Sequence, residues 1–90
     1  MVWEAAIESK FKLLISKIPI FHRHITESTV MRQAEAIAHS RNSSQVEEQD
    51  VVAAFFSDVP SPFYSMMLRL LEQNNFDYKK YGFPKSAHSG

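Results

Sequence analysis

The residues best suited to chemistry are His22, Arg23 and His24, where two imidazoles and a guanidinium could bind a metal or carry a proton. Histidines two positions apart do not share a helix face, and no nearby set of Asp, Glu or Cys side chains completes a tetrahedral site. The sequence therefore predicts no metal site, and the favoured interpretation is a polar loop or helix start that contacts neighbouring carboxylates. If a metal or haem site exists, His22 and His24 are its candidates.

No other residue has the surroundings that catalysis requires. The chain has no cysteine, which excludes disulfides, thiolate nucleophiles and Cys-ligated metal sites. No serine lies in a Gly-x-Ser-x-Gly elbow, and two glycines leave no phosphate-binding loop. His39 is expected to stabilise the end of a helix. The sequence therefore predicts a protein that is not an enzyme, with no catalytic residues and no cofactor.

Arg41 and Asp50 flank a polar turn between two helical segments. Their opposite charges could form an ion pair that clamps the turn from both sides. An exposed pair of this kind contributes about 0.5 kcal/mol, so its loss should loosen the turn without abolishing folding.

Hydrophobic periodicity predicts the first of four helices over residues 2–18. Pro19 should end this helix, because proline disfavours helical geometry in the residue before it. Ile20 and Phe21 would then lie in a tight apolar connection. The apolar stripe of this helix is Trp3, Ile7, Phe11, Leu14 and Ile18.

Three further helices follow in the sequence. The second should begin near Thr26 or Ser28, either of which could cap free backbone amides. The third should span residues 47–56, with acidic residues at its start. The fourth should stop at Asn74-Asn75, and its apolar stripe is Phe63, Met66, Met67, Leu70 and Leu71.

These elements predict an all-α fold, a single compact bundle of about four helices with a short aromatic C-terminal extension. Residues 1–83 would form one helical domain around Trp3, Ile37, Phe55 and Leu70, and residues 84–90 would be a disordered tail. No stretch is long and apolar enough to span a membrane, and the start of the chain does not resemble a signal peptide. A cytoplasmic location without membrane contact is therefore expected.

A possible interaction surface combines basic and aromatic residues. The aromatic extension could stack on nucleic-acid bases, dock on a protein, or fold back over an open side of the bundle. Ten basic and ten acidic residues give zero formal charge, which disfavours nucleic acid as the main partner. The residues of this surface are His22, Arg23, His24, Arg32, Phe76, Tyr78, Lys79, Lys80 and Tyr81.

Short motifs between Trp3 and Ala54 resemble the small helical domain at the C-terminus of the light-independent protochlorophyllide reductase B subunit and its stand-alone bacterial relatives. They are Trp3 itself, Ile18-Pro19-Ile20-Phe21, Ala34-Glu35 followed by Ala38, and Val46-Glu47 leading to Val51. Asn42 stands where glycine is common in that family. The reductase is a nitrogenase-like enzyme whose catalytic core lies elsewhere, so the resemblance implies an accessory or interaction role.

A second resemblance, to the histone fold, rests on Ala34 to Ala38, His39, Val46, Asp50-Val51 and Ala54, together with Arg41 facing Asp50. It implies pairing of two chains through a long central helix. The leading hypothesis is thus a helical protein-interaction or accessory domain, possibly beside a nitrogenase-like or redox enzyme, with another protein or a second copy as its partner. The alternative is a histone-fold-like dimer that binds DNA weakly.

Overall fold

Residues 1–84 of the chain are described by a computed structural model. Four α-helices account for most of them, which confirms the predicted all-α class and the number of helices. Of the tail predicted over residues 84–90, only Pro84 lies within the described residues. The elements in chain order are β1 (Val2–Trp3), α1 (Ala5–Ser16), α2 (Ile20–Ser40), β2 (Gln45–Val46), α3 (Glu48–Asp58), the 3₁₀ helix η1 (Ser61–Phe63), α4 (Tyr64–Gln73) and the 3₁₀ helix η2 (Tyr78–Tyr81).

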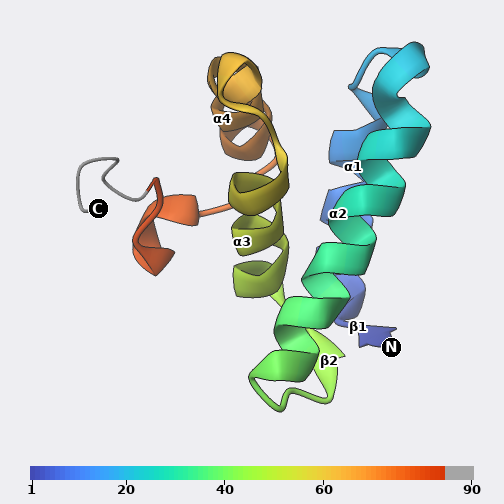
Figure 1. Cartoon of the computed structure of the whole chain (residues 1–90), viewed down its shortest axis with the longest axis vertical. Helices are drawn as coiled ribbons and strands as arrows, with labels where there is room; N and C mark the ends of the chain where they lie inside the picture. Colours follow the sequence, from blue (N-terminus) through green and yellow to red (C-terminus); the bar gives the residue numbers. More distant parts are fainter. Residues whose placement is uncertain (85–90) are drawn as a thin grey trace.

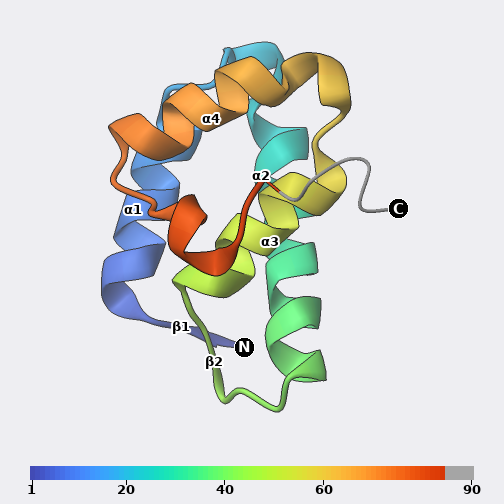
Figure 2. The same ribbon diagram turned by 90° about the vertical axis from the view of Figure 1, so that its left-hand side faces the viewer.

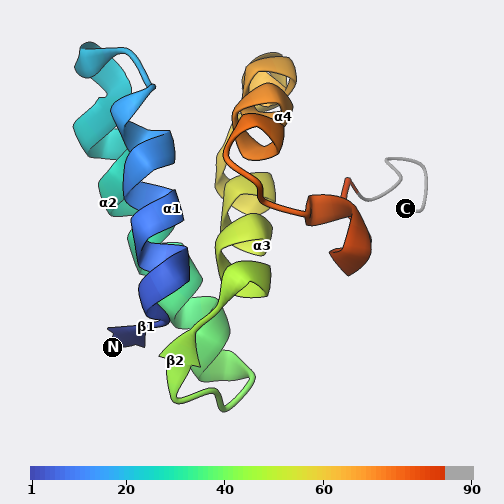
Figure 3. The same cartoon turned by 180° about the vertical axis from the view of Figure 1, so that it is seen from behind.

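The helices form two arms that meet at one end of the molecule. Helices α1 and α2 make one arm and α3 and α4 make the other, with the arms joined near β1 and β2 (Figure 1). The same divergence is seen from behind (Figure 3). Helix α4 runs across the end farthest from the two strands (Figure 2). This arrangement leaves the space between the arms open at the α4 end.

The start of the chain is extended, so the predicted helix over residues 2–18 is wrong in its first turn. Strand β1 pairs in parallel with β2, with Trp3 opposite Val46. The backbone N–H of Glu4 donates to the Val46 carbonyl at 3.0 Å, and the Trp3 indole Nε1 donates to Glu35 Oε2 at 2.9 Å. Val46 and Glu35 are remote from Trp3 in the sequence. The backbone hydrogen bonds between β1 and β2 use groups that a helix would otherwise pair within itself, so the first residues are extended.

Helix α2 begins at Ile20, six residues or more before the predicted start at Thr26 or Ser28. Helix α1 ends at Ser16, before the predicted end at Ile18. Pro19 lies just beyond it and occupies the position before the first turn of α2, where its missing N–H costs nothing. The Arg23 guanidinium donates to the carbonyls of Ser16 and Ile18 at 3.0 Å each. Arg23 therefore holds the corner between α1 and α2, because it satisfies carbonyls that the end of α1 leaves free.

The core lies where the two arms meet. Ala34 and Ala38 are fully buried, and such small side chains permit close approach of neighbouring elements. Four residues were predicted to form the centre of the core. Phe55 is buried in it, whereas Trp3, Ile37 and Leu70 are only partly buried and pack against the outside of the core cluster. The most deeply buried large side chains are Phe11, Leu14, Leu71, Val30, Val46, Val51 and Val52.

The aromatic extension folds back against α3. Asn75 has a φ of 64°, the left-handed stop expected at the end of α4. The ring of Phe56 on α3 contacts those of Tyr64, Tyr78 and Phe83, with centroids 5.7, 5.8 and 4.8 Å away. The extension therefore adds an aromatic cluster to the core of this small domain.

Glu48 at the start of α3 joins three parts of the chain. Its carboxylate lies 3.2 Å from Lys10 Nζ on α1 and 3.4 Å from Lys80 Nζ on η2. It also accepts hydrogen bonds from the Tyr81 hydroxyl at 2.7 Å and the Asp77 backbone N–H at 3.1 Å. Partial burial alone would raise the pKa of Glu48, but the hydrogen bonds from Tyr81, Asp77 and Lys10 outweigh it and lower the pKa to about 2.

Replacement of this carboxylate should change how stability depends on pH. Because the pKa of Glu48 falls on folding, its contribution is complete above pH 4.5 and is lost as the pH drops towards 2. We expect Glu48→Gln to cost about 2 kcal/mol at pH 7 and to flatten the loss of stability between pH 4.5 and 2. Urea unfolding followed by circular dichroism measures both. Glu8→Gln, at an exposed pair with Lys12, is the control, and equal curves for the two variants would contradict the assignment.

Candidate functional site

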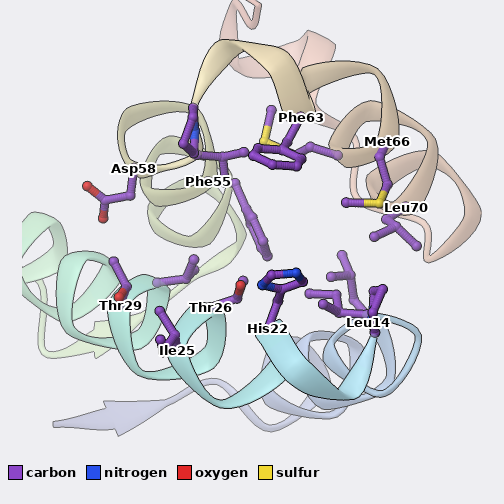
Figure 4. Close-up of a pocket in the computed structure, with 16 residues that line it drawn as sticks. Leu14, His22, Ile25, Thr26, Thr29, Phe55, Asp58, Phe63, Met66 and Leu70 are labelled. Carbon is purple, nitrogen blue, oxygen red and sulfur yellow. The ribbon is translucent and has the colours of Figure 1, made fainter.

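An apolar groove of about 600 Å³ lies between the two arms, at the end that α4 crosses. One wall comes from the end of α1 and the first half of α2, and the other from the end of α3, η1 and α4 (Figure 4). Its volume falls within the range typical of ligand-binding pockets. The residues that line it are Leu14, Ile18, Pro19, His22, Ile25, Thr26, Thr29, Val30, Phe55, Asp58, Val59, Pro60, Phe63, Met66, Met67 and Leu70.

The break between α3 and α4 produces the second wall. Pro60 precedes η1, and Pro62 occupies an early position in it, where a missing N–H is tolerated. The chain turns there, and α4 divides its apolar stripe between core and groove. Met67 is buried, whereas Met66 is 40% exposed in the groove wall. The periodicity of this stripe was predicted correctly, but part of the stripe lines the groove.

Helix α2 contributes most of the polar side chains of the groove. His22, Thr26 and Thr29 are spaced four and three residues apart, so they share one helix face. The His22 imidazole points from α2 into the groove, and Asp58 lies at the edge (Figure 4). His24 is exposed and does not line the groove. The structure therefore separates the two histidines that the sequence suggested as joint ligands.

Large apolar side chains continue from the groove onto the surrounding surface. Ile25 lines the groove and is 69% exposed, and Phe63 on the opposite wall is 50% exposed. Phe21 and Ile20, at the start of α2, are 89% and 70% exposed. Ile20 and Phe21 were expected in a tight apolar connection, and no sequence signal indicated that they would face solvent. Phe21 lies one helical turn from Ile25 and so extends the apolar surface of the groove, whereas Ile20 points to another side of α2. Contiguous apolar surface of this kind marks interaction sites.

The other residues of the predicted interaction surface do not form one patch. Phe76 and Tyr78 are buried, and the Tyr78 hydroxyl donates to Glu72, so neither can stack on a ligand. Arg32 is exposed on α2. Lys79 and Lys80 are exposed on η2, on the other side of α3 from α2 (Figure 1). Tyr81 is half-buried against Glu48.

Arg41 and Asp50 meet in a bidentate pair at the turn before α3. Arg41 Nε and Nη2 lie 2.7 Å from Asp50 Oδ1 and Oδ2. Asp50 is completely buried, and its Oδ2 also accepts the backbone N–H of Glu47 at 2.9 Å. The side-chain hydrogen bonds to Asp50 raise the pKa of Arg41. Asn42 in the same turn has a φ of 62°, the conformation that favours glycine.

The polar side chains that line the groove are His22, Thr26, Thr29 and Asp58. Among residues 1–84 there is no group of three His, Asp or Glu side chains placed to hold a metal ion. Within the same residues, no helix is long and apolar enough to cross a bilayer. Comparison with family models, curated proteins and solved structures finds no match to this chain. The groove itself is therefore the feature from which a function must be argued.

Proposed function

We propose that this chain is a non-enzymatic helical interaction domain that binds a protein through the groove between α2 and α4. The observation that supports this proposal is that the apolar lining continues outward over Ile25 to Phe21. Monomeric proteins seldom leave such large apolar side chains together in water. A bound protein would cover Ile25 and Phe21 and remove them from water.

The exposed rim favours a protein over a small molecule. A compound inside the groove would leave Phe21 and most of Ile25 in solvent. An amphipathic helix would fill the groove and cover its rim, as in other helix-in-groove complexes. Met66 and Met67 suit this role, because their flexible thioether side chains adapt to the shape of a partner.

The sequence resemblance supports an accessory role beside a nitrogenase-like or redox enzyme, and on this proposal the chain acts in the cytoplasm. In the family that the motifs resemble, the helical domain accompanies a catalytic core located elsewhere in the polypeptide. On this proposal the chain supplies binding and the partner supplies chemistry.

A photo-crosslinking experiment tests the groove. A benzophenone amino acid replaces Phe63 on the groove wall, and a matched chain carries it at Lys12, an exposed position on α1 outside the groove. We expect a discrete protein adduct from position 63 that becomes weaker when Ile25→Ser is added. The absence of any adduct from position 63, or an equal adduct from position 12, would refute the proposal.

The histone-fold-like alternative has its own supporting observation. Helix α2 has 21 residues and is flanked by helices of 12 and 11 residues, and the Arg41–Asp50 pair lies in the turn that follows it. This version predicts a DNA mobility shift at low salt that disappears steeply as salt rises. A chain that gives no shift at low salt would exclude it.

A further inference from the structure

We propose that the occupant of the groove is a second copy of this chain, which inserts the first half of its α2 between α2 and α4 of its partner. This inference rests on the proposed function, since it names the protein that the same groove binds. Three observations support it: the exposed apolar side chains of α2, the two-fold arrangement that they allow, and the apolar area that two copies could bury.

The first half of α2 has an apolar outer face that is continuous with its groove face. At about 100° per residue, Phe21 and Ile25 lie some 40° apart around the helix, and Thr29 and His22 follow within a further 60°. Ile25 belongs to both faces, because it lines the groove and is also largely exposed. One helix segment thus provides both a groove wall and a protruding apolar edge that could enter a groove.

A two-fold axis beside α2 would bring the apolar edge of each copy against the groove of the other. It places Phe21 of each copy against the groove of the other, so the same surface is used twice and the assembly closes. Between Ile20 and Val30 the formally charged residues are Arg23 and Glu27, one of each sign. No net like-charge repulsion therefore opposes the approach of two α2 helices.

The apolar area available is a large part of what a specific dimer buries. A fully exposed large apolar residue offers about 200 Å². The four residues of the groove mouth and rim then expose on the order of 500 Å² per chain, against about 800 Å² per partner in a standard interface. Polar neighbours on the same faces, among them Thr26, can supply the difference. The four residues are Phe21, Ile25, Phe63 and Met66.

Sedimentation and light scattering from about 10 µM to about 1 mM test this inference. We expect the wild-type chain to pass from its monomer mass of 10.4 kDa to twice that value. Phe21→Ser, at a side chain with few contacts to lose, should raise the dimer dissociation constant at least tenfold. Leu13→Ser, at an exposed apolar residue that does not line the groove, is the matched control and should leave the constant unchanged.

The outcomes separate this inference from the proposed function. A wild-type chain that stays at 10.4 kDa at about 1 mM, or a dimer that Leu13→Ser weakens and Phe21→Ser does not, overturns the second copy as occupant. If a monomeric chain still gives a specific adduct from position 63 to another protein, the proposed function stands. If a monomeric chain gives no adduct from position 63, both the proposed function and this inference are refuted. An adduct between two copies that Phe21→Ser abolishes supports both.

Discussion

Replacement of Asp50 by alanine is expected to destabilise the protein by about 3–5 kcal/mol, a large share of the stability of a small domain. The carboxylate is fully buried, receives two 2.7 Å contacts from Arg41 and accepts the backbone N–H of Glu47. Its removal leaves the guanidinium and that N–H without their partner at the start of α3. The sequence suggested an exposed pair worth about 0.5 kcal/mol, and burial accounts for the larger expected cost.

Urea unfolding at pH 7 followed by circular dichroism measures this effect. Arg41→Lys keeps the positive charge but cannot form the bidentate pair with Asp50, and should lower the free energy of unfolding by less than Asp50→Ala. Glu47→Gln keeps an acceptor oxygen at the start of α3 but removes the charge that contacts Arg41 at 3.2 Å, and is the matched control with an expected cost below about 1 kcal/mol. If Asp50→Ala costs no more than Glu47→Gln, the pair does not stabilise the turn.

Replacement of Phe56 by alanine should destabilise the protein by about 3–5 kcal/mol, the usual range for loss of a large aromatic side chain from a core. The Phe56 ring contacts Tyr64, Tyr78 and Phe83, so it joins α3 to α4 and to the C-terminal extension. We also expect trypsin to cleave after Lys79 or Lys80 faster in this variant, because the extension loses its main contact.

Tyr64→Phe is the matched control for this cluster. It keeps the ring and removes only the hydroxyl that donates to the Phe56 carbonyl at 2.8 Å, at a cost of about 1 kcal/mol. A Phe56→Ala chain that retains wild-type stability and wild-type trypsin resistance would show that the extension is held by other contacts.

Local properties of the sequence predicted the helices well, but predicted the first residues of α1 and α2 poorly. The stripes on α1 and α4 and the stop at Asn75 follow from periodicity and backbone preference, which are properties of neighbouring residues. The extended conformation of Trp3 depends on Val46 and Glu35, which are distant in sequence. Pro19 was interpreted only as the end of α1, although the same residue also suits the start of α2.

The groove was not predicted, because an apolar stripe looks the same whether it faces a core or an open cleft. Met66 and Met67 have equal hydrophobic character, and only the angle between α4 and the opposite arm decides that one is buried and the other exposed. Phe76 and Tyr78 were considered for a binding surface, with folding back over the bundle as the alternative. Both side chains are buried, and Tyr78 packs against Phe56. The placement of His22 in the groove likewise depends on tertiary packing, whereas its separation from His24 follows from their two-residue spacing on a helix.

Trp3 is the single tryptophan of the sequence, and it lies in the pairing between β1 and β2. Its indole is half-buried beside Phe11 and donates a hydrogen bond to Glu35. The tryptophan fluorescence of this chain therefore originates at one site, where the first residues meet α2 and the turn before α3, and it can be excited selectively in the presence of the three tyrosines. Fluorescence can therefore follow, without a label, the separation of β1 from β2 and from Glu35 on α2. Far-ultraviolet circular dichroism reports the unfolding of the helices separately.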